Sequence, residues 1–160
     1  MRPVYDSKTY QISMARRDIY HDTVKRALRK DAWTITHDPF PLQIGKKRLS
    51  ADLGAERLIS AETGIQKIVV EVKSFVGQSD VKDLEQALGQ YVLYRQILKE
   101  MGIDRLLYLA VSRPTFNSVF TIELGQVLLK NQIIKLIVFD EEREAMLLRS
   151  RYANALWIPD

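Results

Sequence analysis

Apolar and polar positions follow two periods along the chain, one typical of helices and one typical of strands. Three segments carry apolar residues at helical spacing, and we expect helices at residues 16–30, 78–101 and about 119–130. Strand-like alternation or short apolar runs predict strands at residues 32–36, 48–59, 67–75, 106–111 and 133–139, with a last edge strand at 145–149. The order αβββαβαβ indicates one mixed α/β domain.

Turn and capping signals delimit several of these elements. Ser79-Asp80 is suited to cap the start of the long helix, and Gly102 marks its end. The segment Asp38-Pro39-Phe40-Pro41 is predicted to be a turn, because two prolines cannot continue a central strand. The break at Glu62-Thr63-Gly64 joins residues 48–59 and 67–75 into a β-hairpin whose second arm is central.

Composition narrows the class of protein. The chain has 160 residues, 46% of them hydrophobic, and no apolar run of membrane-spanning length, so we expect a cytoplasmic protein with no membrane partner. Residues 1–13 lack a period, and we expect either a poorly ordered extension or an alternative start, followed by a single domain at 14–160. The absence of cysteine and the presence of only two histidines exclude thiolate and multi-histidine metal sites. Oxygen ligands remain, which favour Mg²⁺ or Mn²⁺, and no organic cofactor is predicted.

Positive charge is concentrated in the first predicted helix. The chain has 24 Lys and Arg against 20 Asp and Glu, and residues 16–30 alone account for the net charge of +4. The basic side chains of this α-helical stripe are Arg16, Arg17, Lys25, Arg26, Arg29 and Lys30. They either follow a DNA backbone or form a solvated helix face, and the sequence leaves both interpretations open. The acidic run Asp140-Glu141-Glu142 is predicted to be a solvated turn.

The chemistry-bearing feature is a set of acids and one lysine on the predicted hairpin. Strand periodicity places Glu71 and Lys73 on one face, and a pairing of odd register brings Asp52 to that face. Charged side chains within a run as apolar as Ile-Val-Val-Glu-Val-Lys are costly unless they pair or bind something. Asp52 and Glu71 suit Mg²⁺, which takes one or two carboxylates and completes its shell with water and phosphate oxygens. Lys73 would stabilise charge that develops in a transition state.

The geometry of the turn leaves open which carboxylate lies opposite Glu71. A tight turn centred near Thr63 would place Glu56 directly opposite Glu71. A bulge, or a turn centred nearer Ala61, would place Asp52 there instead. Glu56 is therefore the second candidate metal ligand.

The helix that follows the hairpin adds polar residues on one face. Gln86, Gln90 and Tyr94 recur at four-residue spacing, so their side chains are aligned and can approach the carboxylates or a phosphate. In the first helix, His21 is suited either to a proton shuttle or to packing, and packing is the better supported interpretation.

These motifs, in this order, resemble the PD-(D/E)XK nuclease superfamily, in particular its RecB-like branch. The resemblance implies a restriction-endonuclease-like mixed β-sheet flanked by helices, an αβββαβ core with an additional αβ unit. It assigns the metal and catalytic core to Asp52, Glu71 and Lys73, with Gln90 and Tyr94 in support. The acid that the superfamily often carries in its first helix would fall on Asp18 or Asp22, although the usual Glu is absent. Ala51 replaces the Pro that often precedes the first Asp.

Longer strings resemble the XisH family of fdxN-element excision controlling factors, over residues 14–140. They are Asp18-Ile19-Tyr20-His21, Ala51-Asp52-Leu53, Lys67-Ile68-Val69-Val70-Glu71-Val72-Lys73-Ser74-Phe75, Ala87-Leu88-Gly89-Gln90-Tyr91-Val92-Leu93-Tyr94-Arg95 and Leu107-Tyr108-Leu109-Ala110-Val111-Ser112. This resemblance implies a cyanobacterial protein that controls excision of a DNA element during cell differentiation and acts with a XisI-type partner factor.

Two kinds of function follow as hypotheses. The first is a Mg²⁺-dependent endodeoxyribonuclease that cleaves or binds DNA during programmed rearrangement. The second is a non-catalytic subunit that binds DNA or assembles with the XisI-type factor and a site-specific recombinase. Whether the protein forms a homo-oligomer stays open.

Overall fold

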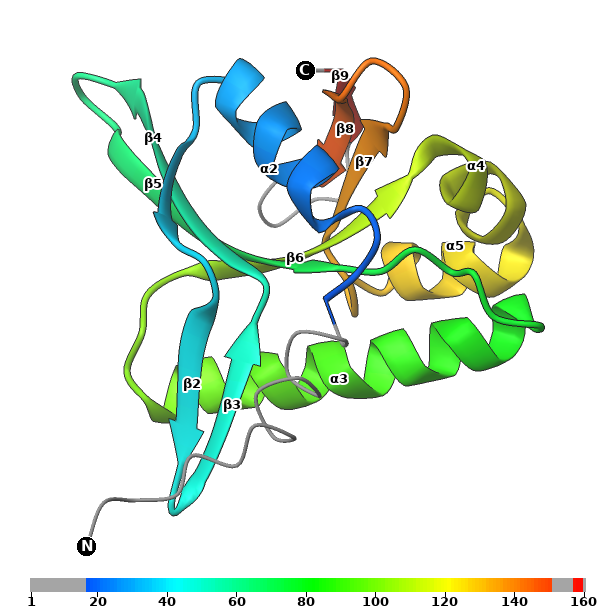
Figure 1. Ribbon diagram of the computed structural model, residues 1–160, viewed down its shortest axis with the longest axis horizontal. Helices are drawn as coiled ribbons and strands as arrows, with labels where there is room; N and C mark the ends of the chain where they lie inside the picture. Colours follow the sequence, from blue (N-terminus) through cyan, green and yellow to red (C-terminus); the bar gives the residue numbers. More distant parts are fainter. Residues whose placement is uncertain (1–16, 151–156, 160) are drawn as a thin grey trace, which may run out of the picture.

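A computed structural model of the chain describes residues 17–150 and 157–159 (Figure 1). Residues 1–13, for which an extension or alternative start is expected, lie outside these ranges. The first elements in chain order are α2 (His21–Lys30), β1 (Thr34–His37), β2 (Phe40–Ile44), β3 (Lys47–Ala51), β4 (Leu53–Ser60), β5 (Gly64–Val72) and α3 (Asp80–Glu100). They are followed by β6 (Leu106–Ser112), α4 (Arg113–Thr115), the π-helical turn η1 (Phe116–Phe120), α5 (Glu123–Lys130), β7 (Leu136–Asp140), β8 (Ala145–Ser150) and β9 (Trp157–Pro159).

Seven strands form one mixed sheet in the order β1-β4-β5-β6-β7-β8-β9. The central pairs β5–β6 and β6–β7 are parallel, and the outer pairs are antiparallel. Parallel strands need a crossover, and α3 and α5 supply the two crossovers. The expected mixed α/β class is therefore confirmed.

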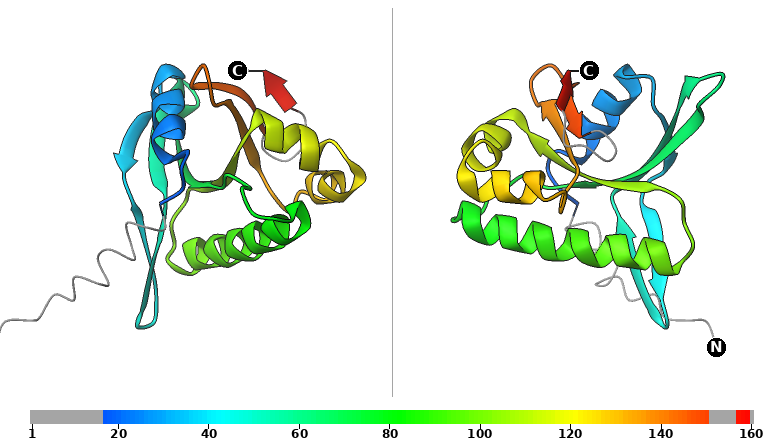
Figure 2. Two further views of the ribbon diagram at one scale, coloured as in Figure 1. Left: turned by 45° about the vertical axis from the view of Figure 1, so that its right-hand side comes forward. Right: turned by 180° about the vertical axis from the view of Figure 1, so that it is seen from behind.

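Two hydrophobic clusters cover the two faces of the sheet. On one face α2 packs through Val24, Ala27 and Leu28 against alternate residues of the strands. On the other face α3, α5 and the β2–β3 hairpin pack against the remaining strand positions, and Figure 2 shows α3 running along that side of the sheet. Strand β6 is buried on both faces as its apolar run predicts. No helix in residues 17–150 is long and apolar enough to cross a membrane.

The long helix follows its capping signals closely. The hydroxyl of Ser79 accepts a hydrogen bond from the backbone N–H of Lys82, so the helix begins at Asp80. Gly102 takes a positive φ of 67° after the last turn. Of the apolar residues predicted to face the core, Val81 and Leu93 are about half exposed, and the aromatic rings of Tyr91 and Tyr94 take the buried positions instead.

The first helix is shorter than predicted. Its described part begins at His21 rather than within residues 16–20, because Asp18 to Tyr20 form a turn in which the Asp18 carboxylate accepts the N–H of Tyr20. Ile19, which the helical pattern placed among the apolar positions, is therefore exposed.

The prediction of a turn at residues 38–41 and a single arm at 48–59 is wrong. Between β1 and β4 the chain forms an additional two-stranded hairpin, β2–β3, with Phe40 opposite Ala51 and Ile44 opposite Lys47. Pro41 is tolerated because this sheet has only two strands, so each strand has a free edge. The hairpin crosses β4 at Gly54, where a Cβ atom would lie 2.7 Å from the ring of Phe40.

Two elements near the C-terminal end also differ from the pattern. The segment expected as one helix at 119–130 divides into η1 and α5, and the hydroxyl of Ser112 caps the short α4 that precedes them. Strand β8 matches the predicted edge strand but is not the edge, because β9 pairs with it.

Candidate active site

The register of the central hairpin decides which carboxylate lies opposite Glu71. Leu53 pairs with Val70, so Asp52 and Glu71 are the next residues along the same antiparallel pair. One Asp52 oxygen, Oδ2, accepts the backbone N–H of Val72 at 2.7 Å. Glu56 pairs with Lys67, four residues away from this point. The structure thus brings Asp52 to Glu71 and leaves Glu56 outside the cluster.

Glu71 is a buried carboxylate in an unfavourable electrostatic position. Glu71 as a residue is only 6% exposed to solvent. Its Oε2 atom has no hydrogen-bond partner within the described structure. Burial, followed by the charge and hydrogen bond of Asp52, raises the pKa of Glu71 well above its ordinary value, while Lys73 acts in the opposite direction. The two carboxylates therefore share a poorly hydrated space in which a cation would be stabilising.

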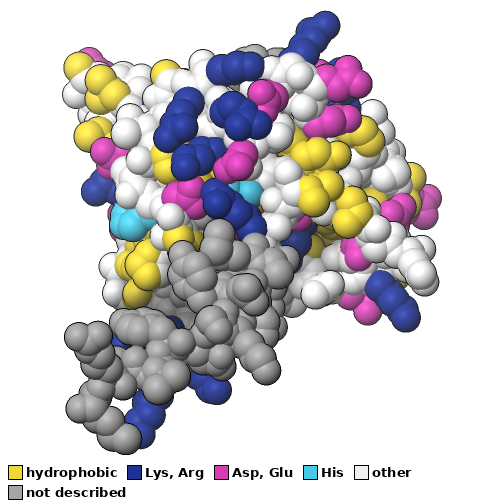
Figure 3. Space-filling view, viewed as in Figure 1, with side chains coloured by type: hydrophobic (Ala, Val, Ile, Leu, Met, Phe, Trp, Pro, Cys, Tyr) yellow, Lys and Arg dark blue, Asp and Glu magenta, His cyan; other side chains and the backbone are white. Residues whose placement is uncertain are grey.

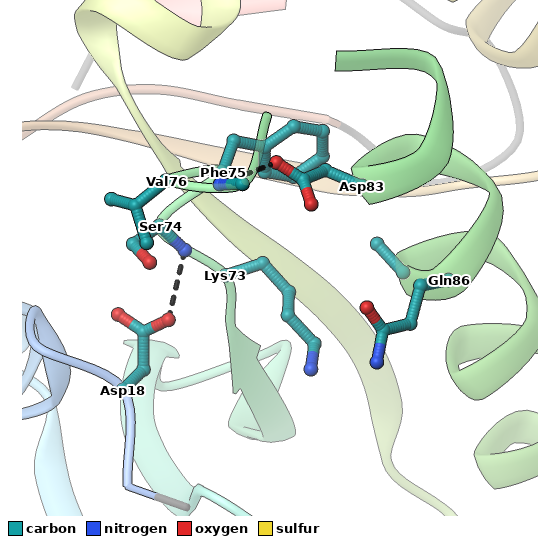
Figure 4. Close-up of a pocket in the computed structure, with 9 residues that line it drawn as sticks. Asp18, Lys73, Ser74, Phe75, Val76, Asp83 and Gln86 are labelled. Atoms are coloured by element: carbon teal, nitrogen blue, oxygen red, sulfur yellow. Dashed lines mark hydrogen bonds between the residues drawn. The ribbon is translucent and has the colours of Figure 1, made fainter. Parts of the chain in front are cut away.

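Lys73 lies where β5 leaves the sheet. Its backbone N–H still donates to the carbonyl of Ala110, at 3.1 Å, so the start of the following loop is held against β6. The side chain lines a small pocket together with Asp18, Asp83 and Gln86, and Figure 4 shows it extending between Asp18 and Gln86. The amine can thus meet an anionic group that enters this pocket.

Two acids hold the walls of this pocket through backbone contacts. Asp18 Oδ2 accepts the N–H of Ser74 at 2.9 Å, and Asp83 Oδ2 accepts the N–H of Gly77 at 2.9 Å. Asp18 therefore lies beside Lys73, whereas Asp22, the other candidate for a first-helix acid, pairs with Arg17 on the surface.

The polar face of α3 divides into two parts. Gln86 lines the pocket, whereas Gln90 donates to the hydroxyl of Tyr94 at 2.7 Å. Burial raises the pKa of Tyr94, and the charges of Glu71 and Asp52 add to the shift. The Tyr94 hydroxyl is thus within electrostatic reach of both carboxylates.

Sequence reasoning missed a histidine-centred network behind Asp52. The ring of His21 is buried, with Nε2 2.8 Å from Oδ1 of Asp38 and Nδ1 3.4 Å from Oδ1 of Asp52. The second oxygen of Asp38 accepts from Lys25 at 2.6 Å. Burial alone would lower the pKa of His21, but its hydrogen bond to Asp52 and the charges of Asp38 and Asp52 raise it above 6.5. An imidazolium donates from both ring nitrogens, so His21 links the two aspartates.

Only a weak signal for this network was present in the sequence. His21 lies three residues before Val24 and seven before Leu28, on the buried face of α2, and a histidine on such a face needs polar partners. Its partners are 17 and 31 residues away in the chain, so spacing alone does not identify them.

Most of the basic side chains along α2 are already paired with acids or backbone oxygens. Arg17 contacts Asp22 and Asp38, Lys25 contacts Asp38, Arg26 contacts Glu144, and Lys30 donates to the carbonyl of Arg143. Arg16 lies outside the described residues. Figure 3 accordingly shows the Lys and Arg side chains over α2 interspersed with acidic ones. This surface is less available to phosphates than its sequence indicates.

The residues present can be compared with the needs of a divalent cation. Across the described ranges, no group of three or more His, Asp or Glu side chains is arranged to hold a metal ion. The Asp52–Glu71 pair nevertheless supplies two carboxylates, and Mg²⁺ is commonly held by one or two carboxylates and water. The orphaned Oε2 of Glu71 and the crowding of like charges fit such an ion.

Comparison with known proteins places the chain among relatives of the same fold. The family model described as "XisH protein" matches residues 14–147. The crystal structure of an XisH family protein from Nostoc punctiforme is similar with a TM-score of 0.73 and 35% identity, over 82% of this chain and 98% of that one. The crystal structure of an fdxN element excision controlling factor protein from Anabaena variabilis gives 0.72 and 40% identity, over 83% and 98%. The search of curated proteins gave no match.

Proposed function

The chain belongs to the XisH family, and we propose that it controls excision of a DNA element through a metal-dependent endonuclease site of the PD-(D/E)XK type. The observation that carries the proposal is the pairing of Asp52 with the buried, incompletely bonded Glu71, with Lys73 two residues further on. A buried carboxylate whose oxygen lacks a partner is costly for a fold and is usually retained for a function. The order of α2, β1, β4, β5, α3 and β6 supports a restriction-endonuclease-like core.

Asp52 and Glu71 are the residues that would hold Mg²⁺ or Mn²⁺. When bound, such an ion would lower the pKa of a water molecule and neutralise phosphate charge. His21 holds Asp52 from behind through Oδ1, and the N–H of Val72 holds it through Oδ2, so the carboxylate is preorganised. A carboxylate that does not reorient during the reaction contributes more to catalysis than a mobile one.

Lys73 and the α3 residues have separate roles in this proposal. The amine of Lys73 faces the pocket beside Asp18 and would stabilise the negative charge that develops on a phosphate oxygen. Tyr94 is buried, bonded to Gln90 and within the electrostatic influence of Glu71 and Asp52, so it would exclude water from the side of the carboxylates that faces α3. Tyr94 and Gln90 are positioning residues, because they act through the carboxylates and not on a reacting atom.

DNA cleavage by the full chain tests the proposal. The wild-type protein is incubated with supercoiled plasmid and with linear duplex in Mg²⁺ or Mn²⁺, with and without a XisI-type partner. Lys73→Ala is expected to reduce the cleavage rate by at least ~100-fold. Lys67→Ala is the matched control, because Lys67 is an exposed lysine on the same strand. Equal cleavage by wild-type and Lys73→Ala proteins would refute the assignment.

A second function is favoured by the contacts that Asp52 already makes. Both of its oxygens have protein partners, so the cluster also suits a nuclease-like subunit that binds DNA, the XisI-type factor or a recombinase without cutting. Tight DNA binding with no cleavage under any metal condition, with or without the partner, would select this alternative.

A further inference from the structure

The β2–β3 hairpin is a projecting arm with a strongly basic tip. Figures 1 and 2 show it extending away from the sheet and past α3. Its turn residues Gly45 and Lys46 are followed by Lys47 and Arg48, and all of these are exposed. From Phe40 to Ala51 the hairpin contains no acidic residue. The tip therefore carries three consecutive cations.

These three cations differ from those on α2 in their surroundings. None of the three forms an ion pair with any residue in the described ranges. Four of the five described basic residues of the α2 stripe, in contrast, have a carboxylate or carbonyl partner. Unpaired, exposed cations keep their full attraction for phosphates, whereas paired cations must first give up a partner.

The arm is anchored firmly enough to present its tip in a defined place. Phe40 and Leu42 belong to the core cluster beneath α3, and the N–H of Gln43 contacts the sulfur of Met101 at 3.4 Å. Gly45 takes the positive φ of 55° that the tight turn requires. The guanidinium of Arg105 lies 5.1 Å from the centre of the Phe40 ring. Within the described ranges, the side chains of Lys46, Lys47 and Arg48 at the tip are exposed and outside the core cluster.

Both ends of the arm lead into the candidate active site. Asp38 lies two residues before β2 and Asp52 directly follows β3, and the ring of His21 contacts both aspartates. A strand rises ~3.3 Å per residue, so the three cations lie roughly 13–20 Å along the arm from Asp52. Successive phosphates of one DNA strand are ~3.4 Å apart along the axis, so this distance corresponds to roughly four to six nucleotides.

We propose that the β2–β3 arm binds the phosphate backbone of duplex DNA through Lys46, Lys47 and Arg48 and thereby sets the position of the duplex relative to Asp52 and Glu71. This inference rests on the proposed action on DNA and names the surface that captures the substrate. A two-stranded β-ribbon fits the major groove of B-form DNA, whereas the major groove of A-form RNA is too deep and narrow. Arg48 and Gln43, which pair across the ribbon, lie together on the face that points away from Phe40 and Leu42.

Binding of duplex DNA in EDTA, followed by fluorescence anisotropy, tests the arm separately from cleavage. The arm variant is Lys46→Gln/Lys47→Gln/Arg48→Gln. The matched control, Lys67→Gln/Lys82→Gln/Lys130→Gln, removes the same number of exposed charges elsewhere. The arm variant is expected to bind roughly 10- to 100-fold more weakly than the control. The slope of log affinity against log salt is expected to fall by ~0.9 for each phosphate that the variant no longer neutralises. Circular dichroism and Tm of both variants verify folding.

Each outcome bears on the inference. Selective loss in the arm variant supports it, even if the wild-type protein cuts no DNA, in which case only the nuclease proposal fails. Equal losses in the two variants overturn it, as does tighter binding to an RNA duplex of the same sequence. Loss confined to Arg26→Gln/Arg29→Gln/Lys30→Gln also overturns it and assigns binding to α2. If the wild-type protein binds no DNA, the inference and the proposed function fail together.

Discussion

Glu71 and Asp140 are two buried acids of the same sheet, and their surroundings are opposite. Asp140, at the end of β7, is only 2% exposed, so the expectation of a solvated turn at residues 140–142 is wrong for its first residue, while the turn itself begins at Glu141. Its Oδ1 accepts the N–H groups of Glu142 and Arg143, and its Oδ2 accepts from Arg113. The bond from Arg143 is the main cause that lowers the pKa of Asp140. Glu71 instead has an oxygen that finds no partner among the described residues, and its pKa is raised.

The difference in hydrogen bonding distinguishes Asp140, a buried acid that stabilises the fold, from Glu71, a buried acid that does not. Asp140 satisfies its charge through two N–H groups of its own turn and the guanidinium of Arg113, so its burial helps to order the β7–β8 connection. Glu71 lies beside a second carboxylate, Asp52, and its burial gains nothing for the folded chain alone. Burial by itself is therefore a poor guide to function, and the completeness of the hydrogen bonding is a better one.

Replacement of Glu71 should give the largest effect. Glu71→Gln keeps the shape of the side chain and removes its charge, so cleavage is expected to fall ~100- to 1000-fold. The variant is expected to have a higher Tm at pH 8, because the repulsion of Asp52 is removed, by ~2–4 °C for each kcal/mol gained. Plasmid cleavage and thermal unfolding measure the two quantities, with the exposed Glu62→Gln as control. A lower Tm with full cleavage would place Glu71 in the structural class with Asp140.

His21 should give an intermediate effect, because it acts on the reaction through Asp52. His21→Gln removes a group that fixes the orientation of a proposed metal ligand, and such changes typically weaken metal affinity or activity 10- to 100-fold. We expect the Mn²⁺ concentration for half-maximal cleavage to rise ~10-fold. The measurement is a metal titration of the cleavage rate beside a Tm for folding. A reduced Tm with an unchanged metal requirement would show that His21 serves only the fold.

Asp140→Asn should affect stability and leave the chemistry unchanged. The amide loses the charge that Arg113 and the two N–H groups complement, so the Tm is expected to fall by a few degrees. Cleavage per folded molecule is expected to equal that of the wild-type protein. A large loss of cleavage at a temperature where the variant is fully folded would contradict the contrast with Glu71.

The smallest effect expected is on the pH dependence of stability. The pKa values of Glu71 and His21 are raised in the folded protein above the ordinary 4.5 and 6.5. Their stabilising contributions are thus complete below those values and are lost as the pH rises through the folded-state pKa. The Tm difference between Glu71→Gln and wild type should therefore grow from pH 5 to pH 8. For Asp38, whose pKa is lowered despite burial, mainly by Lys25, the contribution is instead lost toward acidic pH.

Local sequence patterns predicted most of the helices and strands. The features that they did not predict depend on contacts between residues far apart in the chain. The strand alternation around Glu71 and the apolar run of β6 predicted the centre of the sheet, because both depend on neighbouring residues. The choice between Asp52 and Glu56 required the register, which the turn after Ser60 sets. The link from His21 to Asp38 joins separate elements and has no local signature.

The β2–β3 arm was missed for a different reason. Two prolines outweighed a hairpin signal that was present, namely Gly45 between the apolar residues Leu42 and Leu49. The proline rule holds for central strands, and this arm has only edges. The sequence left the role of the basic stripe open because the acidic partners of its side chains, Asp38 and Glu144, come from other elements.

The pairing of β4 with β5 has a consequence for the rate of folding. This pairing closes across a short turn. In contrast, Ile68 of β5 pairs with Leu106 of β6 only after a segment of on the order of forty residues has folded into the crossover between them. Local pairings form in microseconds, and non-local ones are slower. Asp52 and Glu71 meet at the end of the hairpin farthest from its turn, so the last step of its closure brings two negative charges together. Partial protonation should therefore accelerate folding, and the refolding rate is expected to be higher at pH 5 than at pH 8.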